Sequence, residues 1–273
     1  MKKAILAAAA ALATAIAAFA QGAGDTQQAG EAVPHRMVRV EGGTFDMRGR
    51  SVTLSTFYMD EHPVTQLQWR ELMGTTVRQQ RDMANPLWRM RGEGDNHPMY
   101  YVNWFEAVKF ANERSLRAGL TPTYTINGTN VSWNREANGY RLPTEAEWEF
   151  AARGGVVCYG NFRYSGSNEI DEVAWHNGNS GELTQPVRML RANVLGIYDM
   201  SGNVWEWVWD WEGALPTSGQ ATNPAGPSSG PSRMLRGGSV INSSVHIRSA
   251  SRVNNTQSNR YNHVGFRLVR SAD

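Results

Sequence analysis

The side chains that most often carry out chemistry are sparse in this sequence. Cys158 is the only cysteine, so the chain cannot form an internal disulfide, and we interpret this residue as a small buried apolar side chain rather than a nucleophile. The six histidines show no metal-ligand spacing; they are His35, His62, His97, His176, His246 and His263. The sequence also lacks a local signature of a Ser–His–Asp site and a phosphate-binding glycine loop.

A cluster of charged and aromatic side chains lies in the middle of the chain. Its members are Arg141, Glu145, Glu147, Trp148, Glu149 and Phe150. Carboxylates and arginine at the start of a helix can form a partly buried ion network that holds neighbouring loops in place. We therefore predict that these residues maintain the fold and take no part in catalysis.

Residues 240–263 have the composition of a binding surface. They contain five Asn and five Ser, with His, Tyr, Val and Ile between them. Tyr and His offer rigid contact area and Asn and Ser offer adaptable hydrogen bonds, as in antibody paratopes. The expected ligand contacts are Asn242, Val245, His246, Ser251, Val253, Asn254, Asn255, Tyr261, Asn262 and His263. Val240, Ile241 and Ile247 could face the core instead, and Arg248, Arg252 and Arg260 look like fixed positions. A polar loop with chance enrichment in Asn is the alternative.

The first residues predict export. Lys2 and Lys3 precede an apolar run at 4–18, and Ala18-Phe19-Ala20 has the small-x-small pattern of a signal peptidase site. We expect a signal peptide at 1–20, a flexible tether at 21–36 and one domain at 37–273. No second long apolar run follows, so no membrane span is expected in the mature chain.

The charge balance of the mature chain is close to neutral. The formal net charge of the whole sequence is +2, and removal of Lys2 and Lys3 with the signal brings it to about zero. A balanced charge gives no reason to expect nucleic acid as a partner.

Short periodic segments predict an α+β domain with modest regular structure. Strands are expected at 37–40, 44–47, 52–59 and 264–270, and a hairpin at 124–133 with a type I′ turn at Asn127-Gly128. Helices are expected after the capping residues Thr65, Asn103 and Thr144. Long loops are expected at 75–97 and 215–231.

Several segments together resemble the formylglycine-generating enzyme (sulfatase-modifying factor) family. The strongest are 139–149 (GYRLPTEAEWE), 196–207 (GIYDMSGNVWEW), 236–239 (RGGS) and 265–269 (GFRLV), and weaker matches lie at 40–45, 63–65 and 97–104. They occur in family order from about Val38 to Arg270. The resemblance implies a C-type lectin fold of the formylglycine-generating enzyme type, with short helices and strands joined by long loops.

The same resemblance argues against the family's oxidase chemistry. It places a copper-binding cysteine pair between 236–239 and Arg248, where this chain has residues 240–247 without a cysteine. Soft Cu(I) needs thiolate or thioether ligands, and His246 alone cannot replace them. We therefore expect no copper and no enzyme activity, with an enzyme of altered chemistry as an alternative.

The resemblance also implies a structural calcium site. The matching positions are Asp199 and Glu206 by side chain and Gly202 and Val204 by backbone carbonyl. All four present oxygen, as calcium requires. The alternative is that Asp199 and Glu206 only cap turns or pair with arginine.

Within this framework, residues 240–263 resemble the variable region of diversity-generating retroelement proteins. Such a retroelement randomises adenines in Asn codons, and Gln257 alone falls outside the residues that this process produces. The implied function is an exported, non-catalytic protein, periplasmic, at the cell surface or secreted, that binds an unknown protein or surface ligand. An invariant structural or scaffold protein of the cell envelope is the alternative.

Overall fold

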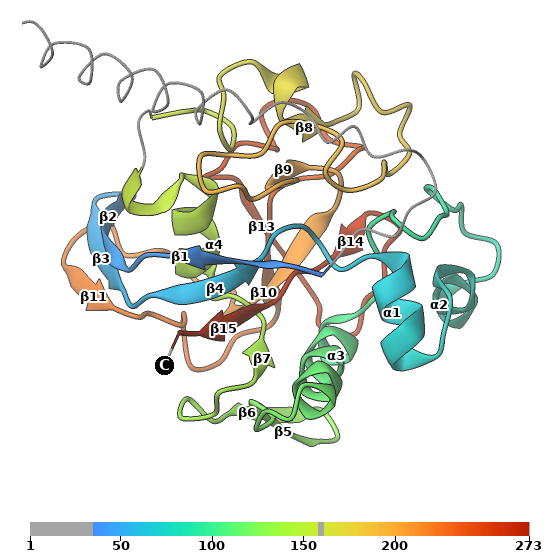
Figure 1. Ribbon diagram of the computed structural model, residues 1–273, viewed down its shortest axis with the longest axis horizontal. Helices are drawn as coiled ribbons and strands as arrows, with labels where there is room; N and C mark the ends of the chain where they lie inside the picture. The colour runs from blue at the N-terminus through green and yellow to red at the C-terminus, as the bar shows by residue number, and fades with distance from the viewer. Residues whose placement is uncertain (1–34, 158–160, 273) are drawn as a thin grey trace, which may run out of the picture. The chain divides into compact units, whose positions relative to one another are not determined.

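The computed structural model describes residues 35–157 and 161–272 (Figure 1). These residues belong to the second of two compact units, Ala32–Asp273. The predicted export signal at 1–20, most of the predicted tether at 21–36 and Cys158 lie outside the described residues. Within the described part of the chain, no helix has the length and apolar character needed to cross a bilayer.

One antiparallel sheet joins the two ends of the domain. It contains β1 (Met37–Val40), β4 (Phe57–Asp60), β15 (Val269–Ser271) and β7 (Tyr140–Arg141) in that order. Val269 pairs with Met59 on one side and with Arg141 on the other. The C-terminal strand is therefore an inner strand of this sheet.

A second sheet carries the polar stretch 240–263. Its order is β13 (Arg252–Asn255), β12 (Arg233–Arg236), β10 (Trp205–Trp211) and β14 (Val264–Gly265). β10 pairs with β12 antiparallel and with β14 parallel. β13 lies at the edge of the sheet, so the stretch runs from one edge to the other.

The remaining strands form smaller sheets at the periphery. β11 (Gln220–Thr222), β3 (Arg50–Leu54) and β2 (Gly43–Met47) form a three-stranded sheet. Two further pairs are β5 (Tyr124–Asn127) with β6 (Asn130–Trp133) and β8 (Ala174–Trp175) with β9 (Ser201–Gly202).

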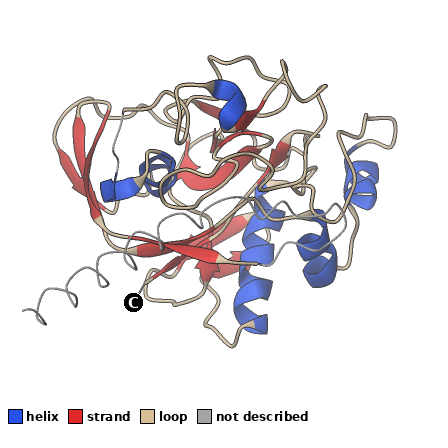
Figure 2. Cartoon of the chain, turned by 45° about the horizontal axis from the view of Figure 1, so that its top comes forward, coloured by secondary structure: helices blue, strands red, loops and turns tan. Residues whose placement is uncertain are grey.

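The helices are short and begin at capping boxes. They are α1 (Gln66–Met73), α2 (Val77–Ala84), α3 (Trp104–Arg117) and α4 (Glu145–Ala152), with 3₁₀ turns at Gly155–Val157 and Ile170–Glu172. The predicted caps Thr65, Asn103 and Thr144 are confirmed, since each side chain accepts a hydrogen bond from the third helical N–H. Figures 1 and 2 show α1, α2 and α3 together at one end of the sheets and α4 at the other.

The prediction of a continuous loop at 75–97 was wrong, because α2 lies within it. Thr76 caps this helix and Gln79 completes a capping box. Only Val77 and Gln80 are buried, so no apolar stripe marks the helix in the sequence.

Two predicted strands are interrupted. The segment 52–59 divides at Ser55 and Thr56 into β3 and β4, and 264–270 divides into β14 and β15, which lie in different sheets. Buried apolar residues run up to both breaks, so periodicity alone did not locate them. The predicted loop 215–231 contains β11, which pairs parallel with β3.

The hairpin at 124–133 is confirmed, but its turn was assigned one residue too early. Asn127 pairs with Asn130, so Gly128 and Thr129 form the turn. Gly128 has a φ of 62°, whereas Thr129 is not among the described residues with positive φ. A type I′ turn needs positive φ at both central residues and is therefore excluded.

Two aromatic-rich clusters form the core. One packs α1 and α3 against β10 and the C-terminal segment through Trp69, Trp104, Phe110, Trp207 and Phe266. The other packs α4 against the N-terminal strands through Trp148, Phe150 and Met59. The sheet that contains β10 separates the two clusters, because alternate residues of this strand contribute to each.

Buried ion pairs connect these layers. Glu206 of β10 and Arg267 are both fully buried, and Arg267 donates from Nε at 2.7 Å and Nη2 at 2.8 Å to the Glu206 carboxylate. Trp148 Nε1 of α4 donates to the same carboxylate at 2.8 Å. Arg141 donates two hydrogen bonds of 2.7 Å to Glu147 at the start of α4. The predicted ion network therefore exists and is built into the core.

We expect Arg267→Met to reduce the free energy of unfolding by about 3–5 kcal/mol, because Glu206 would remain buried without its cation. Urea unfolding followed by tryptophan fluorescence measures this loss. Arg78→Met is the matched control, since Arg78 pairs with Glu93 at the surface, where such a pair contributes about 1 kcal/mol or less. A loss for Arg267→Met no larger than that of the control would contradict the structural role.

Candidate functional site

The stretch 240–263 forms two loops around an edge strand. Residues 240–251 turn through several bends after β12, β13 follows, and 256–263 lead to β14. Figure 1 shows the broad strand β10 near the centre of the domain, with β14 next to it and β13 beyond β12 on the other side. The candidate site is therefore carried on the sheet that contains the family motifs.

Part of the stretch is buried and shapes the loops. Val240 and Ile247 are fully buried, which confirms that they face the core, whereas Ile241 is half-buried. Gly238 has a φ of +79°, and a Cβ at this position would lie 2.3 Å from Ile247 Cγ2. Only glycine allows this close approach, so the first loop is anchored at its start.

Arginines anchor the rest of the stretch. Arg236 pairs with Glu149 and Glu145 of α4 and also donates to the carbonyl of Ser249 at 2.9 Å. Arg252 donates to both oxygens of Glu145, at 2.7 and 2.8 Å. Arg260 donates to Glu106, the capping-box residue of α3, at 2.7 Å. Two of the three arginines expected to be fixed therefore have ion-pair partners, and the third, Arg248, is exposed.

Three predicted contacts lie around one hollow. Val245, His246 and Ser251 line it together with Trp205 and Arg248. Val245 is 50% exposed and His246 is also exposed. Ser251 Oγ donates to the carbonyl of Val245 at 3.1 Å, which ties the two sides of the hollow together.

The edge strand presents three more predicted residues. Val253 and Asn254 are exposed and Asn255 is half-buried. Asn254 Nδ2 donates to Glu212 at 2.8 Å, and Asn255 Oδ1 accepts from Asn259 at 2.9 Å. Since side chains alternate along a strand, Val253 and Asn255 share one face and Asn254 points to the other.

The last three predicted contacts lie beside the loop after α2. Tyr261 stacks on Trp88, with ring centroids 6.4 Å apart and an angle of 4° between the ring planes. The ring centroids of Tyr261 and His263 are 5.6 Å apart. Asn262 Nδ2 donates to the carbonyl of Arg89 at 3.1 Å. Trp88 is 43% exposed and the neighbouring Leu87 is 90% exposed. Sequence reasoning did not identify these two residues, although large apolar side chains in a polar segment were a signal.

Asn242 is engaged within its own loop. Its Oδ1 accepts from Ser239 N at 3.0 Å and from Ser239 Oγ at 2.7 Å, and its carbonyl accepts from Asn177 N. The residue is half-buried. It therefore shapes the loop that stands where the resemblance places the cysteine pair.

The two side chains predicted to bind calcium, Asp199 and Glu206, have protein partners in the fold. Glu206 accepts three hydrogen bonds from Arg267 and Trp148, as described above. Asp199 is buried, and its oxygens accept from Arg188 N at 2.9 Å and Asn203 Nδ2 at 3.1 Å. In this arrangement Glu206 does not fit a calcium ligand, because its donors would have to leave first. The calcium site at Asp199, Gly202, Val204 and Glu206 stays a prediction.

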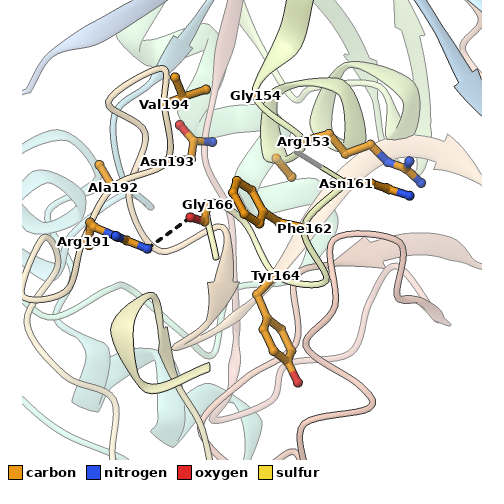
Figure 3. Close-up of a pocket in the computed structure, with 11 residues that line it drawn as sticks. Arg153, Gly154, Asn161, Phe162, Tyr164, Gly166, Arg191, Ala192, Asn193 and Val194 are labelled. Atoms are coloured by element: carbon orange, nitrogen blue, oxygen red, sulfur yellow. Dashed lines mark hydrogen bonds between the residues drawn. The ribbon is translucent and has the colours of Figure 1, made fainter. Parts of the chain in front are cut away.

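A separate hollow lies near the C-terminal end of α4. Figure 3 shows Arg153, Asn161, Phe162 and Asn193 around it, and Arg191 Nη2 donating to the carbonyl of Gly166 at 3.2 Å. None of the predicted ligand or calcium residues lines this hollow. It therefore does not belong to the surface formed by 240–263.

His263 is held neutral at physiological pH. Burial lowers its pKa to about 4, and the positive charge of Arg91 adds to the effect. A histidine in the unfolded chain has a pKa near 6.5. Between about pH 6.5 and 4 this residue is therefore protonated in the unfolded chain but neutral in the folded chain. The stability that His263 contributes is therefore present above pH 6.5 and is lost as the pH falls through this window.

We expect the free energy of unfolding to fall by roughly 1–2 kcal/mol between pH 7 and pH 5 through His263 alone. Urea unfolding of the wild type and of His263→Asn at both pH values measures this share as the difference between the two losses. The variant should lose less stability than the wild type on acidification. Equal losses would show that His263 is not desolvated in the fold.

Comparison with known proteins identifies related sequences. Residues 23–272 match the sulfatase-modifying factor enzyme 1-like domain. The chaperone protein LppX of Paenibacillus barcinonensis is 41% identical over 212 residues, which are 64% of this chain and 71% of that protein. The formylglycine-generating enzyme of Streptomyces coelicolor is 33% identical over 196 residues, 65% of this chain but only 54% of the enzyme.

A solved structure extends the likeness to three dimensions. Treponema denticola variable protein 1 superposes with a TM-score of 0.77 at 31% identity, covering 90% of this chain and 98% of that one. The predicted resemblance to variable proteins of diversity-generating retroelements is confirmed as a similarity of fold and sequence. The α+β architecture described above is the C-type lectin fold of the formylglycine-generating enzyme type. The chain belongs to the sulfatase-modifying factor family.

Proposed function

We propose that the protein is an exported, non-catalytic binding protein whose residues 240–263 form a diversified ligand surface. The observation that carries the proposal is the contrast within this stretch between residues that are fixed or buried and residues whose side chains are exposed. Arg252 and Arg260 are ion-paired to helices, and Val240 and Ile247 are buried. Most of the predicted contacts lie between these anchors, where their side chains reach the surface.

The scaffold supports such a role. The anchors of 240–263 connect to α3, α4 and the central sheet, so the backbone of the stretch is held from three directions. A binding surface on a rigid frame tolerates changes of side chain without loss of the fold. The likeness to Treponema denticola variable protein 1 supports the same assignment.

The loop that corresponds to the family's cysteine pair supports binding rather than oxidation. Residues 240–247 contain no thiol, and Cys158 is the only cysteine of the chain. A two-thiolate copper site therefore cannot form within one molecule. The ligand would be a protein or surface molecule that matches a mixed surface of Tyr, His, Asn and Val.

A second candidate is an invariant accessory protein of the cell envelope. The observation that favours it is the 41% identity to LppX, which is named as a chaperone protein. In that case the stretch would be a fixed surface for one partner. The two candidates differ in whether 240–263 changes between cells.

Sequencing the 3′ end of the gene across many cells of one population tests the proposal. We expect substitutions confined to codons 240–263, at positions where a nearby near-copy of the gene end has adenines. The codons of Arg252 and Arg260 should remain constant, because their ion pairs hold the frame. A uniform sequence without a near-copy would favour the invariant protein instead.

The stability cost of substitutions tests directly whether exposed and anchor residues of 240–263 differ in role. We expect Val245→Asn, His246→Asn and Val253→Asn each to change the free energy of unfolding by no more than about 0.5 kcal/mol, because these side chains are exposed. Arg252→Asn is the matched comparison in the same stretch, with an expected loss of roughly 1–3 kcal/mol from unsatisfied Glu145. Urea unfolding measures all four. Equal losses at exposed and anchor positions would contradict a surface built to vary.

A further inference from the structure

A second pocket lies between α4, the end of β10 and the loop 213–227. Its volume is about 330 Å³, and its lining includes Trp211, Leu215 and Pro227 together with Glu145, Asp210 and Arg252. Most of this lining is apolar. None of the predicted ligand contacts of 240–263 lines it, although the anchor Arg252 does, so the inference goes beyond the proposed function.

The loop that closes the pocket is fixed by backbone hydrogen bonds. Asn223 N donates to Thr53 O at 2.9 Å, and Ser51 N donates to Gly219 O at 3.0 Å. Arg252 donates to the carbonyl of Gly213 at 3.0 Å. A Cβ on Gly226 would lie 2.8 Å from Asp210 Cβ, so the loop passes directly against Asp210. Contacts within the protein therefore form the pocket.

Two carboxyl groups lie in this apolar pocket, and their partners differ. Both oxygens of Glu145 are taken by Arg252, and Arg236 binds one of them as well. Asp210 is only 5% exposed, and its Oδ2 accepts from Glu145 N at 2.8 Å. Among the described residues, no arginine, lysine or histidine forms a salt bridge with Asp210.

The missing counter-ion has an electrostatic consequence. Burial raises the pKa of Asp210 to about 8, and the negative charge of Glu145 adds to the rise. The carboxyl is therefore largely protonated at neutral pH. A cation placed beside it would restore the ionised form and replace a desolvated acid by a charge-assisted hydrogen bond.

We propose that this pocket binds a small organic cation, a protonated amine or amidinium attached to an apolar group, with Asp210 as its counter-ion. The apolar walls take up the body of the ligand, and Asp210 sets its orientation. Arg252 does not oppose the cation strongly, because Glu145 neutralises it. The same chemistry is offered by a free amine and by an arginine side chain of a peptide.

Isothermal titration calorimetry on the full chain tests the proposal with benzamidinium, its neutral isostere benzamide and the anion benzoate. We expect benzamidinium to bind at least about tenfold more tightly than benzamide, a difference that a charged hydrogen bond supplies. A blocked Gly-Arg-Gly peptide in a parallel titration separates the two sources, since it binds better only if a peptide side chain is the natural occupant. Tighter binding of benzamide or benzoate, or no binding of either cation, would overturn the proposal.

Two variants locate the interaction. Asp210→Asn should reduce the preference for benzamidinium over benzamide to less than about twofold, because the counter-ion is lost. Glu212→Gln is the matched control, since Glu212 is close in sequence but does not line the pocket, and it should keep the preference. Loss of the preference in the control as well would mean that the overall electrostatic field of the protein, and not Asp210, attracts the cation, and would overturn the proposal.

A pH series on the wild type keeps the test valid if Asp210→Asn does not fold. Affinity for benzamidinium should rise by up to about tenfold per pH unit between pH 6 and 8 and then level off, because the cation binds the ionised acid. The charged groups that act on Asp210 or line its pocket are Glu145, Glu147, Arg50, Arg233 and Arg252. Benzamide should show no such rise, and an equal rise for both would overturn the assignment to Asp210.

Discussion

The buried pair between Glu206 and Arg267 joins the central strand of this domain to its C-terminal segment. Glu206 belongs to the central strand β10, and Arg267 lies between the last two strands, β14 and β15. Trp148 donates from α4 to the same carboxylate, and Arg267 donates to the carbonyls of Tyr198 and Asp60. One carboxylate thus positions a helix, two sheets and the C-terminal segment. An uncompensated charge at this place would be costly, so the pair enforces one arrangement of these elements.

The same kind of interaction extends from the core to the surface. Glu145 and Glu149 of α4 hold Arg236 and Arg252. Arg236 in turn holds the loop before β13 at the carbonyl of Ser249, and Arg252 holds the loop after β10 at the carbonyl of Gly213. The helix start is therefore shared between the fold and the candidate binding surface. Neighbouring residues of 240–263 can therefore have different roles. Arg252 is an anchor, for example, and the next residue, Val253, is an exposed predicted contact.

Much of the local structure followed from the sequence, because its causes are local. Capping boxes located α1, α3 and α4, and the ion network around α4 was predicted from its residues. α2 has the same capping signal, but it packs only two side chains inward, so its apolar periodicity is absent. The breaks between β3 and β4 and between β14 and β15 depend on which sheet each half joins. That choice is made by distant strands and leaves no mark on local periodicity.

The candidate site could be predicted as a composition but not as a shape. The stretch 240–263 was identified from its residue types, whereas the exposure of Leu87 and the stacking of Trp88 on Tyr261 arise from packing between distant segments. Asp210 was not singled out because its burial depends on the loop 213–227 folding over it.

The place of β15 between β4 and β7 has a consequence for protein synthesis. A ribosome translates 240–263 before the inner strand of the first sheet, so any product that stops within the stretch lacks β14 and β15 and leaves that sheet open. Neither of the two four-stranded sheets is therefore complete until the whole stretch has been translated.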